Sequence, residues 1–284
     1  MKTICILLIT FLLTVAVQAQ GESEEKKDTL WTPRGVIGIN LSQVAFENWS
    51  QGGENSIAYT LFTLLGLDYI GDHWKWKNSL KIAYGRTKVG SDQYKTNDNE
   101  IFFESTLSRD FNWAVSPYFG MTARTAVTKG FNYSVDPAMR VVDFIDPLYL
   151  TEGLGFVYDK IDNFSFRLGI GFKQTFANTF SSMYTDDPDT PNEVESFKFE
   201  SGIESVTTYN VKFLENMEYF TYLRLFGRFE DLAVWDVRWD NIIVANINEY
   251  VNVNFNLLLV YDVNETLKTQ IKEALQIGIS YRLF

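Results

Sequence analysis

A single stretch near the end of the chain, residues 251–261, constrains the fold most strongly. Apolar or aromatic residues occupy every second position there: Val251, Val253, Phe255, Leu257, Leu259 and Tyr261. The positions between them begin with Asn252, Asn254 and Asn256. A period of two over this length predicts a β-strand with two chemically different faces. Such a strand is typical of a barrel wall with lipid outside and a polar lumen inside.

The composition fits a strand of this kind repeated many times. Of the 284 residues, 46% are hydrophobic and 16% are aromatic, yet the mean hydropathy is only -0.11. Alternation averages the hydropathy of lipid-facing and lumen-facing positions, while the membrane interfaces favour Tyr, Trp and Phe. The sequence therefore predicts an all-β fold: a transmembrane, antiparallel, up-and-down β-barrel.

The first residues predict export. Lys2 precedes an apolar run from Ile4 to Val17, and Val17 and Ala19 are small residues at the positions that a signal peptidase recognises. This pattern indicates a signal peptide over residues 1–19, with cleavage expected after Ala19. The run is shorter than about 18 residues, which disfavours a transmembrane anchor. Residues 20–34 are expected to form a periplasmic lead-in without regular structure. Residues 35–284 are expected to form the outer-membrane barrel.

The residues available for chemistry are few. The only cysteine, Cys5, lies in the predicted signal peptide, and His73 is the only histidine. No catalytic partner for His73 can be named, so an enzyme is not expected. The same scarcity disfavours a metal site, and no cofactor is predicted. The formal net charge of -11 at pH 7 disfavours nucleic-acid binding, which needs a cationic surface.

About 12 segments with strand-like alternation follow residue 34. Their expected ranges are 35–46, 56–69, 74–84, 99–110, 114–129, 148–159, 164–176, 196–209, 218–229, 233–247, 250–262 and 274–284.

The links between these segments alternate in length. Links after even-numbered segments are tight, whereas most links after odd-numbered segments are longer: 85–98, 130–147, 177–195 and 263–273. Short periplasmic turns and longer external loops are the usual asymmetry of outer-membrane barrels. The pattern therefore predicts that both termini are periplasmic.

A soluble lipocalin-like barrel is the main alternative, because the hydrophobic period does not report which face is inside. About 12 strands is too many for a small soluble barrel. Tryptophans such as Trp74, Trp76 and Trp113 also cluster at the ends of the predicted strands, as expected at membrane interfaces. These two features favour the outer membrane.

One motif between the first two predicted strands is the most distinctive in the chain. It comprises Asn48, Trp49, Gly52, Gly53, Glu54 and Asn55. The two glycines would supply positive-φ positions for a tight loop, which Glu54 and Asn55 would cap. The alternative is that Trp49 and Glu54 contact a ligand or a protein partner. The structural role is preferred, because Gly-Gly beside Asn is ordinary turn chemistry.

The same region resembles a known family. The motif, together with Asn40 to Val44, the Trp76 to Leu80 stretch and Tyr84-Gly85, resembles an uncharacterised family of bacterial outer-membrane β-barrel proteins that carry an Asn-Trp-x-x-Gly-Gly-Glu-Asn motif. The resemblance implies a fold and a location. It implies no established activity.

Charged residues of both signs occupy the predicted inward positions. The candidate lumen charges are Arg124, Arg167, Arg224, Asp236, Arg238 and Asp240. Arg238 is expected to lie between Asp236 and Asp240, which precede and follow it on the same strand face. Such residues can cross-link into a closed polar core or line a narrow channel, and about 12 strands permits both.

The sequence therefore predicts an outer-membrane barrel with a mostly closed polar lumen and a structural or assembly-partner role. The alternative is a narrow porin-like channel for small solutes. The expected partners are outer-membrane lipid and, during biogenesis, the barrel assembly machinery. A protein partner at the Trp49 loop is a further hypothesis.

Overall fold

The computed structural model describes residues 30–284 except 49, 188–189, 191 and 265. Its barrel strands are β1 (Trp31–Val44), β2 (Ser56–Ile70), β3 (Trp74–Val89), β4 (Lys95–Arg109), β5 (Ser116–Thr125), β8 (Leu148–Tyr158), β9 (Phe164–Phe176), β10 (Phe197–Leu214), β11 (Met217–Arg228), β12 (Trp235–Asn246), β13 (Val251–Asp262) and β14 (Thr266–Arg282).

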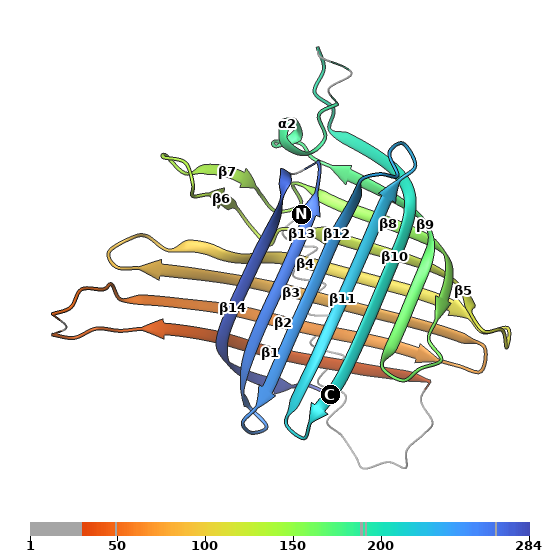
Figure 1. The fold of residues 1–284 in the computed structure, drawn as a ribbon, viewed down its shortest axis with the longest axis horizontal. Helices are drawn as coiled ribbons and strands as arrows, with labels where there is room; N and C mark the ends of the chain where they lie inside the picture. Colours follow the sequence, from red (N-terminus) through yellow and green to blue (C-terminus); the bar gives the residue numbers. More distant parts are fainter. Residues whose placement is uncertain (1–29, 49, 188–189, 191, 265) are drawn as a thin grey trace, which may run out of the picture. The chain divides into compact units, whose positions relative to one another are not determined.

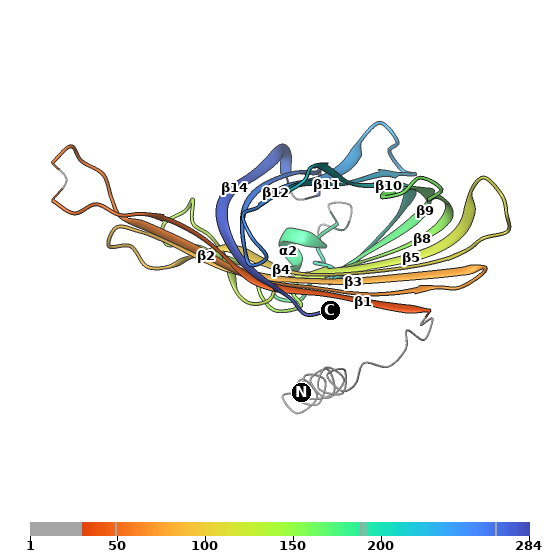
Figure 2. The same cartoon turned by 90° about the horizontal axis from the view of Figure 1, so that it is seen from below.

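These strands close into one antiparallel barrel in the order β1-β14-β13-β12-β11-β10-β9-β8-β5-β4-β3-β2. Figure 1 shows β10–β14 crossing in front of β1–β4, and Figure 2 shows the same wall from below. The predicted all-β barrel of about 12 strands is confirmed. The predicted signal peptide, residues 1–19, lies outside the described residues.

Two small elements lie outside the wall. A hairpin of β6 (Gly130–Asn132) and β7 (Met139–Val142) interrupts the link from β5 to β8. A short helix, α2 (Ser181–Tyr184), lies between β9 and β10. Among the described residues, no helix is long and apolar enough to cross a membrane.

The side chains of the wall alternate between an apolar exterior and a polar interior. On β9, Phe166, Leu168 and Ile170 are exposed, whereas Arg167 and Lys173 on the opposite face are buried. Successive residues of a strand point to opposite faces, so the apolar set lies outside the barrel and the charged set inside it. This is the arrangement of a barrel in lipid and the reverse of a soluble lipocalin-like barrel.

Aromatic residues gather on the exterior near both ends of the barrel. The end where β1 begins and β14 ends is termed the terminal end, and the opposite end the loop end. At the terminal end, the Trp31 ring lies 5.1 Å from Tyr69 and 5.8 Å from Trp76, measured between ring centroids. At the loop end, Phe176 and Phe197 are 5.0 Å apart. Two such bands are expected where the wall crosses the two membrane interfaces.

The first strand begins earlier than predicted. Residues 31–34 pair with residues 66–69 of β2, so they belong to the barrel and not to the predicted lead-in of residues 20–34. Pairing explains the difference, because Trp31 packs on β2 and β3 while Arg34 forms an ion pair of 2.9 Å with Asp68. The part of the predicted lead-in before residue 30 lies outside the described residues.

Two predicted long loops are wrong. Most of residues 85–98 is strand, because β3 continues to Val89 and β4 begins at Lys95. The predicted loop 263–273 is mostly β14, which begins at Thr266. In both segments polar side chains occur on both faces of the strand, so the sequence does not alternate between apolar and polar residues. The backbone is nevertheless paired with the neighbouring strand.

Candidate functional site

Inward-facing charges meet across the barrel lumen in a group termed the Glu100 cluster: Glu100, Lys81, Arg124 and Arg238. Glu100 on β4 accepts hydrogen bonds from Lys81 on β3 at 2.8 Å and from Arg238 on β12 at 2.9 Å. The Arg124 Nε atom on β5 lies 3.3 Å from the same carboxylate. Strands β4 and β12 are not neighbours in the wall. The pair between Arg238 and Glu100 therefore spans the lumen.

The structure changes the predicted partners of Arg238. Its Nε atom pairs with Asp240 at 2.8 Å, as the strand spacing suggests. Its second carboxylate is Glu100 and not Asp236, which pairs with Lys173 instead. The expectation that Arg238 lies between Asp236 and Asp240 as their shared partner is therefore wrong. The cause is barrel closure, which brings β4 and β9 within reach of β12.

A second group, nearer the loop end, is termed the Lys173 cluster: Lys173, Glu200, Asp236 and Asp262. The Lys173 ammonium lies 2.7 Å from Asp262, 3.1 Å from Asp236 and 3.5 Å from Glu200. Arg228 supports the group from β11, 3.3 Å from Glu200. Lys173 is only 6% exposed and Glu200 only 4%. Burial of this degree requires partners, because an isolated charge inside a protein is very costly.

Two further ion pairs lie inside the wall. Arg167 on β9 donates to Glu104 and Thr106 on β4, although β8 and β5 separate these strands. Arg224 on β11 donates to Glu204 on β10 at 2.6 Å. The Arg167 pair links two strands that are not neighbours in the wall. The Arg224 pair adds a side-chain contact between two neighbouring strands.

Aromatic side chains fill the space beside these charges. Phe226 is 1% exposed, and Tyr118 and Tyr222 are also buried. The Arg124 guanidinium lies 4.9 Å from the Phe102 ring centre, a distance that favours a cation–π interaction. Charge pairs and aromatic rings together occupy the interior between β4 and β11.

Each of the six predicted lumen charges has an ion-pair partner. The pairs are Arg124 with Glu100, Arg167 with Glu104, Arg224 with Glu204, Asp236 with Lys173, and Arg238 with Asp240. The sequence reasoning missed Glu100 and Glu104. Their alternation with Ile101 and Phe103 was a usable signal, because it places both carboxylates on the inward face of β4.

The described residues of the motif between β1 and β2 are exposed and lie in a loop. Asn48 has a φ of 56°, Gly52 of 81° and Gly53 of 129°, a region that favours glycine and tolerates asparagine. A Cβ atom on Gly53 would lie 2.8 Å from the Phe46 ring. The loop therefore needs glycine at this position for both conformation and space.

Asn55 ties this loop to its surroundings. Its side-chain oxygen accepts a hydrogen bond of 2.6 Å from the Phe46 N–H, and its backbone oxygen accepts one of 2.7 Å from Gly90 in the turn between β3 and β4. Glu54 is exposed beside it, and Trp49 lies outside the described residues. Asn55 thus has a capping role, while the role of Trp49 stays a prediction.

His73, for which no catalytic role was predicted, lies in the turn between β2 and β3, where its backbone oxygen accepts a hydrogen bond of 2.7 Å from the Asp110 backbone N–H. In the part of the chain that the structure describes, no group of three or more His, Cys, Asp or Glu side chains is arranged to hold a metal ion.

Residues 41–131 match the family described as a protein of unknown function, DUF3078. The match covers the loop motif and β2–β5, and it confirms the predicted resemblance to an uncharacterised family. It does not test the motif itself. No curated protein matches the chain.

Several solved barrels are similar in structure at low sequence identity. The translocator domain of the autotransporter NalP from Neisseria meningitidis has 8% identity and a TM-score of 0.38, covering 99% of this chain and 97% of that one. The COG4313 outer membrane channel from Pseudomonas putida F1 has 11% identity and a TM-score of 0.40, covering 92% and 98%. The NanC porin has 10% identity and a TM-score of 0.39, covering 87% and 98%. These values are too low to carry over a function.

The location follows from the barrel itself. The wall is closed, its exterior is apolar, and aromatic bands lie near its two ends. Closed barrels with a lipid-facing apolar band are proteins of the outer membrane. The chain is an outer-membrane β-barrel protein, and outer-membrane lipid surrounds its wall.

Proposed function

We propose that this protein is a closed outer-membrane barrel with a structural or assembly-partner role, and that it is neither an enzyme nor a constitutive pore. The observation that carries the proposal is the pair between Arg238 and Glu100, which joins two non-adjacent strands across the lumen at 2.9 Å. A solute crossing the barrel would meet this pair in its path.

The energetics support a stable closure. Side chains of Arg238 and Glu100 are only 14% and 15% exposed. Separating a buried ion pair without replacing its partners is strongly unfavourable, because each charge then loses both its partner and access to bulk water. The Lys173 cluster braces an arc of the wall nearer the loop end.

We also propose that both termini are periplasmic. The two longest links between barrel strands, residues 126–147 and 177–196, lie at the loop end. Longer links are usual on the external side of outer-membrane barrels. The assembly machinery remains the expected partner during biogenesis, and the exposed loop with Glu54 is the surface offered to a protein partner.

A narrow channel for small solutes is the second candidate. The hydroxyl groups of Tyr118 and Tyr222 are buried in the lumen without a hydrogen-bond partner among the described protein atoms. Buried polar groups usually bond to protein or to water. Water beside these hydroxyls would give small solutes a route past the charge clusters.

A liposome-swelling assay separates the two candidates. The closed-barrel proposal predicts that liposomes holding the wild-type protein swell in arabinose no faster than protein-free liposomes. Liposomes holding a Glu100→Gln, Lys173→Gln double variant that still folds should swell faster, because the pair across the lumen is lost and the wall beside it is less well braced. Rapid swelling with the wild-type protein would favour the channel.

Photo-crosslinking in cells tests the partner surface. A photoreactive residue at Glu54 should give a defined protein adduct, whereas one at Asn112, in the turn between β4 and β5, should not give the same adduct. Identical adduct patterns at both positions would remove the argument for this loop as the partner surface.

A further inference from the structure

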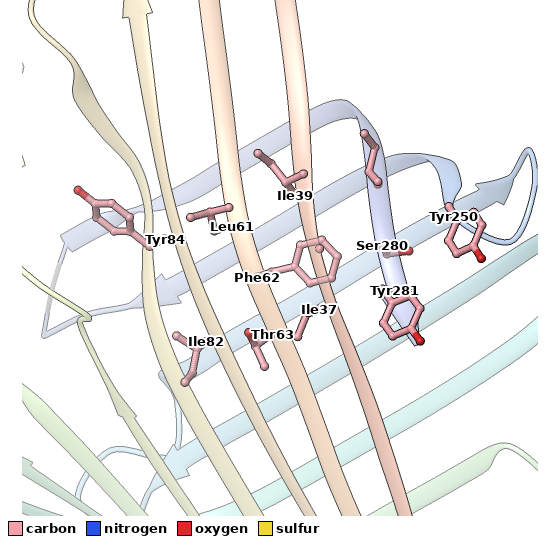
Figure 3. Close-up of a pocket in the computed structure, with 12 residues that line it drawn as sticks. Ile37, Ile39, Leu61, Phe62, Thr63, Ile82, Tyr84, Tyr250, Ser280 and Tyr281 are labelled. Carbon is pink, nitrogen blue, oxygen red and sulfur yellow. The ribbon is translucent and has the colours of Figure 1, made fainter. Parts of the chain in front are cut away.

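The outer face of the barrel is hollowed near the junction of its first and last strands. A groove of about 610 Å³ crosses β1, β2, β3 and β14 and is mostly apolar (Figure 3). Its outward-facing lining includes Ile37, Leu61, Ile82, Tyr84, Ile279 and Tyr281. The groove lies on the face that contacts lipid, so its natural occupant is an apolar chain from the membrane.

The groove leads along β3 towards two cations. Tyr84 belongs to the groove, and Arg86 and Lys88 follow it at alternate positions. Leu61 pairs with Tyr84, and the next outward residue of β2, Tyr59, pairs with Arg86. Because alternate residues share a face, these cations lie on the outer face directly beyond the apolar groove.

Tyr94, in the turn between β3 and β4, contacts both cations. The Arg86 guanidinium lies 5.6 Å and the Lys88 ammonium 5.8 Å from the centre of the Tyr94 ring. Arg86 also donates a hydrogen bond to the backbone oxygen of Tyr94. These contacts position the two positive charges side by side at the loop end.

Neither cation has an acidic partner. Among the residues that the structure describes, no carboxylate forms an ion pair with Arg86 or Lys88, although nearby Lys95 pairs with Asp92 at 2.9 Å. The buried Arg86 Nε atom also has no hydrogen-bond acceptor among the described protein atoms. In a chain with a net charge of -11, two adjacent cations without carboxylates are suited to an external anion.

We propose that this surface binds a phosphorylated membrane lipid. Its acyl chain occupies the groove, and its phosphate contacts Arg86 and Lys88. Arginine suits a phosphate because its donors match the phosphate oxygens, while lysine adds a compact positive charge. The continuity from Tyr84 to Arg86 favours a lipid over a free anion, because the apolar and cationic parts adjoin. The site lies outside the wall and does not depend on a closed lumen.

Native mass spectrometry can test the proposal with the full barrel in detergent. The probe is lipid A, a phosphorylated and acylated disaccharide, compared with the same lipid after removal of its phosphates. An Arg86→Gln, Lys88→Gln variant should retain lipid A at least about fivefold less well than the wild type, because charged hydrogen bonds are lost. The matched control is Arg109→Gln, Lys212→Gln, which removes the same charge at the terminal end and should retain lipid A normally.

A second pair of variants tests the groove. Thr63→Trp places a large side chain within the groove lining and should lower lipid A retention, whereas Thr207→Trp, at an outward position of β10, should not. A gel-shift comparison of boiled and unboiled protein verifies folding for each variant.

Three results would overturn the proposal. Equal retention of lipid A by the wild type and by the folded Arg86→Gln, Lys88→Gln variant would remove the role of the cations. Equal retention of the dephosphorylated lipid by the wild type would remove the role of phosphate. Displacement of lipid A by millimolar inorganic phosphate would identify a free-anion site instead of a lipid site.

Discussion

The Glu100 cluster and the Lys173 cluster are opposite in charge arrangement. Glu100 is one carboxylate among three cations, whereas Lys173 is one cation among three carboxylates. The loss of either central residue leaves like charges together inside the barrel. The consequences differ, because a carboxylate can bind a proton as the pH falls, whereas a guanidinium does not release one.

The two clusters also connect different parts of the wall. The Glu100 cluster joins β4 to β12 across the lumen, while the Lys173 cluster joins β9, β10, β12 and β13 along one side. The first spans the interior of the barrel, and the second braces an arc of the wall. We therefore expect the larger effects on stability and permeability from the first.

The largest effect is expected from Glu100→Gln. The substitution leaves Lys81, Arg124 and Arg238 without their shared carboxylate, and we expect the free energy of unfolding to fall by about 3–5 kcal/mol. Urea titration of the folded barrel in lipid vesicles measures this quantity. The loss should persist from pH 8 to pH 5, since arginine stays charged. A loss below about 1 kcal/mol would mean that the cluster is not a buried, coupled unit.

Lys173→Gln should come next and should behave differently with pH. At pH 8 we expect a loss of about 3 kcal/mol, because Glu200, Asp236 and Asp262 repel one another without the ammonium. The loss should shrink in acid, because a proton bound by any of these carboxylates removes one of the charges that repel one another. The same urea titrations at several pH values check this. An equal loss at every pH would contradict the contrast between the clusters.

A smaller effect is expected from Arg238→Ala, because Glu100 retains Lys81 and Arg124. We expect a loss of about 1–3 kcal/mol, the cost of leaving partners of a charged hydrogen bond unpaired. The matched control is Val237→Ala, an adjacent residue on the lipid-facing side, which should cost less. Equal and negligible losses in both variants would show that the inward assignment of Arg238 is wrong.

The smallest effect concerns an ion pair between two turns at the terminal end. Lys160 donates a hydrogen bond of 2.7 Å to Asp110, and this bond lowers the pKa of the Asp110 carboxyl below its usual value. The resulting stabilisation is present above the ordinary aspartate pKa and is lost as the pH falls through the lowered pKa. Carboxyl NMR titration should show a lower Asp110 pKa in the wild type than in Lys160→Ala. An unchanged Asp110 pKa would remove this contribution.

The sequence predicted the faces of the strands well but not the partners across the lumen. On β12, apolar and charged residues alternate, which is enough to place the charged residues together on one face. The apolar residues are Trp235, Val237 and Trp239, and the charged residues are Asp236, Arg238 and Asp240. This alternation could not predict that Arg238 would meet Glu100, because that contact depends on how the barrel closes. The prediction of a long loop at residues 85–98 was wrong for another reason. The strands there are polar on both faces, so the sequence lacks the apolar period of two that would have identified them.

Single-channel recording in planar bilayers tests the central claim, that charge pairs across the lumen keep the barrel closed. The wild-type protein, verified as folded before reconstitution, should give no steady conductance in potassium chloride. The Glu100→Gln variant should give discrete openings, whereas Val237→Ala should remain silent. A steady wild-type conductance that Glu100→Gln leaves unchanged would contradict the claim.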